Sequence, residues 1–177
     1  MVFLKTERLI LRSLAAKDVL IMYDYRNDPR CAQYQRGQVK TQSELAALVT
    51  RREQDTFSVD APFMAAVALR DSDEMVGEIV VMPKDFTISL GYTFSYRHHR
   101  RGYAYEALSA LIDTFHARFP AWDFVSFTEP ENTASIALLK KLGYTDVGYL
   151  PSMQSRAFCK WPNKETWAEL TAATAHK

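Results

Sequence analysis

The spacing of apolar residues changes period along the chain, and each period predicts a kind of element. Apolar positions three and four residues apart indicate helices. These helices cover 16–26, the residues behind a capping box at Thr41–Glu44, 104–115, Asn132–Leu142, and a last stretch from the capping residue Asn163 through about Ala173. Gly143 follows the fourth helix, where a left-handed C-terminal cap is expected.

Short apolar runs bounded by polar turns indicate strands. The runs are 8–12, Phe63–Arg70, Met75–Met82, Phe86–Phe94, Phe124–Phe127, Tyr144–Leu150 and Ala157–Trp161. The second, third and fourth runs are joined by short polar turns, which predicts an antiparallel meander. Helices separate the later runs, and a helical crossover places the strands that it joins parallel. The pattern therefore predicts an α/β fold with a mixed sheet.

Composition suits a single domain over residues 1–177, with 47% hydrophobic and 24% charged residues. The formal charge is +1, from 22 Lys and Arg against 21 Asp and Glu, which argues against nucleic acid as the main partner. Two distant cysteines, Cys31 and Cys159, favour neither a zinc site nor a disulfide framework. Without a signal peptide or an apolar run of membrane-spanning length, we expect a cytoplasmic monomer or homodimer with no metal and no membrane partner.

A basic turn precedes the third predicted helix. Arg97–Arg101 carries three arginines and two histidines, and Gly102 follows directly. The first turn of a helix has unpaired N–H groups and the positive end of the dipole, and glycine lets a ligand approach the backbone closely. The turn therefore fits a diphosphate. Its single glycine matches neither a P-loop nor a dinucleotide fingerprint, and taken alone it is equally compatible with a solvated basic loop.

Two segments in the right order resemble a known family. The loop His99–Ala104, HRRGYA, and the segment Thr128–Tyr144, TEPENTASIALLKKLGY, resemble the GNAT superfamily of N-acetyltransferases, especially its RimJ/RimL-like branch. The likeness covers residues 6 to about 150. It implies an α/β GNAT fold with a mixed, mostly antiparallel central sheet flanked by helices. In that fold a splayed parallel strand pair forms the acetyl-CoA cleft.

The resemblance implies that the chain is an enzyme that uses acetyl-CoA as its co-substrate. The acetyl group would pass directly to a primary amine, either a protein N-terminus or a small molecule. The residues that would bind the pantetheine arm are Phe94, Ser95, Tyr96 and Asn132. The residues that would bind the phosphates are Arg101, Gly102, Tyr103, Ala104 and Tyr105, through their backbone, and Lys141 at a peripheral phosphate.

For the chemistry, the resemblance places Ser135 near the sulfur of the thioester, where its hydroxyl would protect the leaving thiolate. The alternative is that Ser135 only bonds back to Asn132 at the start of the helix. Glu78 is a candidate general base if its side chain points into the cleft, and a solvent-exposed strand carboxylate otherwise. Glu129, in the turn before Asn132, is a comparable candidate. Glu106 lies in the first helical turn, where its negative charge interacts favourably with the helix dipole, and it is predicted to have a structural role.

The acceptor side rests on a mixture of aromatic and charged residues, with Arg26, Asp28, Arg30 and Arg36 among the charged ones. Tyr25 and Tyr34 lie in and after the first helix, where the family walls its acceptor cleft, and Tyr92 is either a core residue or a substrate contact.

Three positions depart from the family. His99 stands where Gln or Arg is usual, which matters little if the contact is made through the backbone. Ser89 replaces a frequent Glu, and Leu139 replaces a frequent Tyr that acts as general acid, so a non-catalytic acyl-CoA sensor is the alternative function. A nucleic-acid binder that stacks bases on Tyr96, Tyr103 and Tyr105 is disfavoured by the neutral charge.

Overall fold

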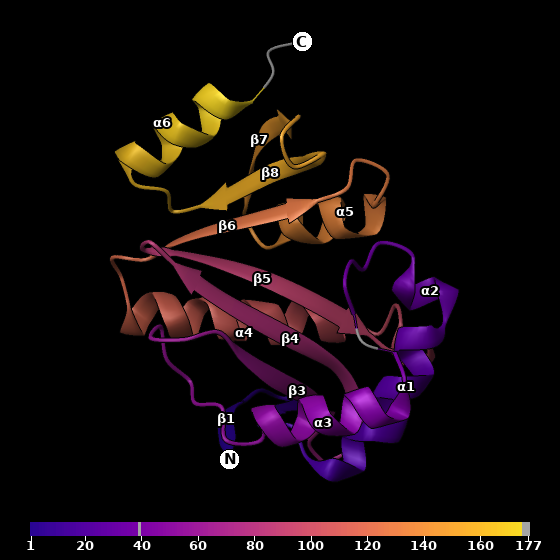
Figure 1. Cartoon of the computed structure of the whole chain (residues 1–177). Helices are drawn as coiled ribbons and strands as arrows, with labels where there is room; N and C mark the ends of the chain where they lie inside the picture. The colour runs from indigo at the N-terminus through magenta and orange to yellow at the C-terminus, as the bar shows by residue number, and fades with distance from the viewer. Residues whose placement is uncertain (39, 175–177) are drawn as a thin grey trace. The chain divides into compact units, whose positions relative to one another are not determined.

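The computed structural model describes residues 1–38 and 40–174. The chain divides into two compact units. The first comprises Met1–Met82 and Gly91–Leu111, and the second comprises Pro83–Leu90 and Ile112–Lys177. Strand β5 (Thr87–Phe94) and helix α4 (Tyr103–Arg118), both labelled in Figure 1, each contribute residues to both units.

The first unit contains an antiparallel array of strands. These strands are β1 (Val2–Lys5), β2 (Leu9–Arg12), β3 (Phe63–Leu69) and β4 (Met75–Lys84), followed by β5. The register places Leu11 opposite Val67 and Ala66 opposite Glu78. The strands β3, β4 and β5 are the predicted meander, which the structure confirms.

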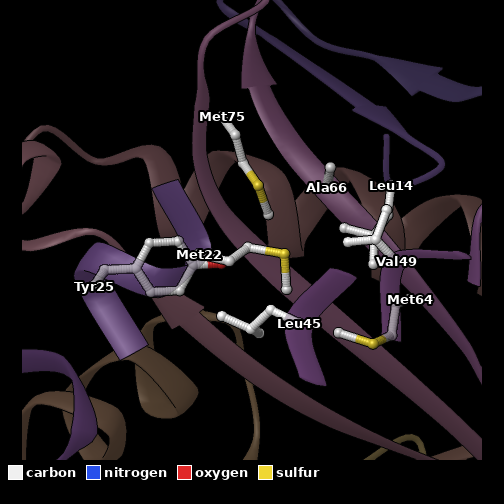
Figure 2. Close-up of a cluster of buried hydrophobic side chains, with 8 residues drawn as sticks. All are labelled: Leu14, Met22, Tyr25, Leu45, Val49, Met64, Ala66 and Met75. Atoms are coloured by element: carbon white, nitrogen blue, oxygen red, sulfur yellow. The ribbon is translucent and has the colours of Figure 1, made fainter. Parts of the chain in front are cut away.

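Helices α1 (Val19–Asn27) and α3 (Gln42–Arg52) cover one face of these strands. Their buried side chains form one cluster with residues of β3 and β4 (Figure 2). The cluster contains Leu14, Met22, Tyr25, Leu45, Val49, Met64, Ala66 and Met75. The capping box that starts α3 is confirmed, since the Thr41 side chain accepts a hydrogen bond from the Glu44 amide. This packing fixes α1 against the strands, and with it the residues at the end of α1.

The second unit contains the parallel strand pair. β5 pairs with β6 (Asp123–Thr128) through Thr87 opposite Asp123 and Ile88 opposite Phe124. β6 then pairs antiparallel with β8 (Ser155–Lys160), and β8 with β7 (Thr145–Leu150). Helices α5 (Thr133–Lys141) and α6 (Lys164–Ala173) complete the unit. The strand order β1-β2-β3-β4-β5-β6-β8-β7 confirms the predicted mixed, mostly antiparallel sheet.

Some elements were not predicted. Strand β1 and the short helix α2 (Pro29–Ala32) both escaped the periodicity analysis. The helix predicted over 16–26 ends at Asn27, and the next residue, Asp28, caps α2 by accepting a hydrogen bond from the Arg30 amide at 2.9 Å. Gly143 has φ of +84°, which confirms the left-handed position after α5. Within the described residues, no helix has the length and apolar character needed to cross a membrane.

Candidate active site

The basic turn forms the entrance to α4. After a short 3-10 turn at Tyr96–His98, Arg100 and Gly102 both have positive φ, +61° and +80°. Glycine adopts this conformation freely, whereas Arg100 requires support from its surroundings. The first intrahelical hydrogen bond runs from the Glu106 amide to the Gly102 carbonyl at 3.0 Å. The amides of residues 102–105 therefore precede the helical ladder, as an anion site at a helix start requires.

Glu106 closes a network beside this loop. One carboxylate oxygen accepts hydrogen bonds from the Thr6 hydroxyl at 2.5 Å and the Arg8 amide at 2.9 Å, and the other accepts from Arg8 Nε at 2.7 Å. Partial burial by itself raises the pKa of Glu106, but the hydrogen bonds from Thr6 and Arg8 and the Arg8 charge hold that pKa below its usual value. Glu106 is thus an ionised acceptor tied to the β1–β2 turn, in line with the structural role predicted for it.

The end of β5 supplies the residues predicted to hold pantetheine. The Phe94 carbonyl accepts a hydrogen bond from the Cys31 thiol at 3.2 Å and lies 2.9 Å from His99 Nε2. The Ser95 amide donates to the Val76 carbonyl at 2.9 Å. These groups already have protein partners, so a pantetheine arm at Phe94 and Ser95 would have to share or replace them. That assignment stays a prediction.

The second unit carries the other predicted coenzyme residues. Asn132 is the N-cap of α5, and its side-chain oxygen accepts a hydrogen bond from the Ser135 amide at 3.1 Å. The cap uses the oxygen of the Asn132 amide group, while the nitrogen carries the donors that a pantetheine contact needs. Ser135 is half-buried in the first turn, and Lys141 is exposed in the last turn of α5. Leu139, at the position of the family tyrosine, is buried.

A cavity of about 350 Å³ lies in the first unit, over β4 and β5. Its apolar lining comprises Leu48, Met64, Val80 and Met82, and its polar lining comprises Arg26, Gln35, Arg36, Gln38, Glu78 and Thr93. Gly91 and Tyr92 of β5 complete one wall with Gly37. Of the tyrosines predicted to contact substrate, Tyr92 thus lines the cavity. Tyr25 and Tyr34 are not among its lining residues, Tyr25 being fully buried in α1 and Tyr34 half-buried beyond α2.

Glu78 occupies the cavity wall as part of a buried network. The residue is 1% exposed, and its carboxylate accepts a hydrogen bond from the Tyr25 hydroxyl at 2.7 Å and forms an ion pair with the Arg26 guanidinium. The alternative of a solvent-exposed strand carboxylate is therefore wrong. Burial raises the pKa of Glu78, although Arg26 and Tyr25 both oppose that shift. A buried carboxylate with a raised pKa in a cavity wall is a candidate proton acceptor.

Arg26 and Arg36 belong to the region expected to wall the acceptor cleft, but the sequence did not indicate that Arg26 pairs with Glu78 or that the whole loop 35–38 lines the cavity. The Gln35 side chain donates to the Tyr92 carbonyl at 3.0 Å. The mixture of charges and aromatics in this region marked it as a candidate wall, but nothing in it distinguished these residues from their neighbours. Across residues 1–38 and 40–174, no three side chains among His, Cys, Asp and Glu gather as a metal site requires.

Known proteins match this chain both in sequence and in fold. Residues 8–145 match the family model described as an acetyltransferase (GNAT) domain. The uncharacterised N-acetyltransferase YnaD of Bacillus subtilis is 27% identical over 146 residues, which cover 81% of this chain and 83% of YnaD. An acetyltransferase of the GNAT family from Bacillus anthracis superimposes with a TM-score of 0.75 at 23% identity, covering 90% of this chain and 96% of that one. RimL, a ribosomal L7/L12 alpha-N-protein acetyltransferase solved with coenzyme A, superimposes with a TM-score of 0.75 at 17% identity. The match covers 90% of this chain and 97% of RimL.

Proposed function

The chain belongs to the GNAT acetyltransferase family, and on this basis we propose that it transfers the acetyl group of acetyl-CoA directly to a primary amine. The loop that opens α4 carries this proposal, because its leading amides at 102–105 and its basic residues suit a diphosphate. The coenzyme A bound to RimL supports the same choice of co-substrate. The residues assigned to pantetheine and phosphate in the sequence analysis are part of this proposal.

The acceptor amine enters the cavity beside Glu78. The amine nitrogen attacks the thioester carbonyl, the carbon–sulfur bond breaks, and the acetyl group stays on nitrogen as an amide. Glu78 takes the proton that the amine loses, and Tyr25 and Arg26 hold the carboxylate in place. Ser135 donates a hydrogen bond to the developing thiolate of coenzyme A. The cavity volume of about 350 Å³ suits a small acceptor or the first residues of a peptide.

Acetyl-CoA is expected to raise the melting temperature, because a ligand that binds the folded state stabilises it in proportion to the logarithm of its concentration. At 100 times the dissociation constant the gain is about 2.7 kcal/mol. Thermal unfolding with acetyl-CoA measures it, and free thiol released with a panel of primary amines measures transfer. No thermal shift would overturn the proposal, whereas a shift without thiol release for any amine would favour the sensor.

Gly91→Val is expected to raise the KM for the amine about tenfold, because the added side chain occupies part of the cavity. A tenfold change corresponds to about 1.4 kcal/mol of binding free energy. A Cβ built at Gly91 meets Met82 and Val80 at 3.8 Å, which is ordinary contact, so the strand accepts a side chain there. Gly91→Val therefore keeps the fold and narrows the cavity. The KM for acetyl-CoA stays unchanged.

Gly91→Ala is the matched control, because it adds one methyl group at the same position. Steady-state kinetics are expected to rank the amine KM in the order wild type, Gly91→Ala, Gly91→Val. An amine KM that is the same in all three proteins would place the acceptor elsewhere.

A further inference from the structure

Arg8, near the N-terminus, contacts the loop His99–Ala104, 93 residues away at Arg101. It lies in the turn between β1 and β2, where the Arg70 amide donates to the Arg8 carbonyl at 2.9 Å and holds the backbone. Its guanidinium pairs with Glu106 at 2.7 Å and lies over the Tyr103 ring, 4.7 Å from the ring centroid. These contacts hold the arginine against the first turn of α4.

The same guanidinium fixes one peptide group of the loop. Arg8 Nη1 donates to the Arg101 carbonyl at 3.0 Å. In a planar trans peptide the carbonyl and the following N–H point in opposite directions, and the described residues contain no cis peptide. A carbonyl that points at Arg8 therefore turns the Gly102 N–H away from Arg8. That N–H is the first of the four that precede the helical ladder.

The loop needs such a restraint. Arg100 and Gly102, on either side of Arg101, both adopt the left-handed conformation, which is unfavourable for a residue with a Cβ. A Cβ added at Gly102 would lie 3.4 Å from Arg8 Nη2, so the guanidinium packs closely against this backbone. Removing Arg8 would let the 101–102 peptide rotate toward a more relaxed conformation.

We propose that Arg8 is a positioning residue for coenzyme binding: it orients the 101–102 peptide so that the Gly102 N–H faces the diphosphate. This inference rests on the proposed function, in which that loop binds acetyl-CoA. Glu106 acts with Arg8 by fixing the guanidinium through two of its nitrogens. Arg8 thus contributes through the backbone and not as one more cation at the rim.

The test compares two ligands and two arginines. Arg8→Met is expected to weaken acetyl-CoA about tenfold in isothermal titration, the loss typical of one hydrogen bond from a charged donor. Binding of acetyl-pantetheine, which lacks the diphosphate, stays within about twofold because the loop is not its partner. Arg70→Met is the matched control. It removes an exposed arginine that donates to the Thr6 and Glu7 carbonyls of the same turn.

A second variant, Arg8→Lys, keeps the inference testable if Arg8→Met does not fold. Lysine keeps the charge and a donor for Glu106, but its single ammonium lacks the fork that also reaches the Arg101 carbonyl. We expect it to retain the wild-type melting temperature and still to bind acetyl-CoA about tenfold more weakly. Equal losses in Arg8→Met and Arg70→Met would overturn the inference in favour of simple charge, as would full affinity in Arg8→Lys. Wild-type protein that binds no acetyl-CoA would instead overturn the proposed function itself.

Discussion

Glu78→Gln is expected to lower kcat by a factor of about 10²–10⁴, the range for removal of a general base, while the dissociation constant for acetyl-CoA stays unchanged. Glutamine has nearly the same shape and keeps an oxygen toward Tyr25, but an amide takes no proton from the amine. The carboxylate lies in the cavity wall of the first unit, where the acceptor is proposed to bind. Steady-state kinetics with a saturating amine, together with calorimetric titration of acetyl-CoA, measure both quantities.

Glu78→Gln can lower the measured rate either by unfolding part of the protein or by slowing the reaction, and the two effects have to be measured separately. Arg26 is 3% exposed, and losing its carboxylate partner leaves a buried charge whose typical cost is about 3–5 kcal/mol. Rates are therefore normalised to the folded fraction, determined by thermal unfolding under assay conditions. If Glu78 serves only as the counter-ion of Arg26, the folded fraction falls and kcat per folded molecule remains at the wild-type value.

Tyr25→Phe tests the same residue through its pKa. The tyrosine hydroxyl donates to Glu78 at 2.7 Å and lowers the pKa of that carboxyl. Without this hydrogen bond the pKa rises further above its usual value. A general base works when deprotonated, so activity is lost as the pH falls through its pKa. The acidic limb of the kcat–pH profile is therefore expected at higher pH in Tyr25→Phe, and an unmoved limb would contradict a proton-accepting Glu78.

Most of the fold followed from local patterns. The capping box at Thr41–Glu44 and the left-handed Gly143 act within one turn of helix, so a short stretch of sequence contains the whole signal. Strand β1 is four residues long with exposed ends, and it is stabilised by pairing with β2. So short a run has little periodicity of its own. Helix α2 is also four residues long, so it too has little periodicity of its own.

A site feature made of neighbouring residues could be found from the sequence, whereas contacts between residues far apart in the chain could not. The loop before α4 is one contiguous motif, and the structure places it at the start of the helix, with positive φ at Arg100 and Gly102. That it binds a diphosphate stays a prediction. The partners of Glu78, by contrast, lie 52 and 53 residues away in α1, and the Arg8–Glu106 pair spans 98 residues. A strand pattern shows that Glu78 lies on one face of β4, but the helix packed on that face decides whether the carboxylate is solvated or buried.

Ser135→Ala is expected to lower kcat about 10²-fold and to leave the KM for acetyl-CoA nearly unchanged. A hydroxyl near the sulfur stabilises the thiolate only as the carbon–sulfur bond breaks, so its contribution appears in the transition state and not in coenzyme binding. Leu139 stands at the position of the family tyrosine and has no proton to donate, so it does not replace the lost hydroxyl. Thiol-release kinetics under acetyl-CoA and amine saturation measure the effect.

Ser135→Ala keeps the N-terminal cap of α5. The cap of α5 joins Asn132 to the backbone amide of Ser135, and alanine retains that amide. The helix start is therefore preserved, and a loss of turnover is not a consequence of a lost cap, which by itself costs about 0.5–2 kcal/mol of stability. Thr133→Ala, which removes an exposed hydroxyl two residues earlier in the same helix, is the matched control and keeps the wild-type rate. A Ser135→Ala enzyme within about twofold of the wild-type rate, but with a lower melting temperature, would show that the hydroxyl supports the fold and that the leaving thiolate is stabilised by another group.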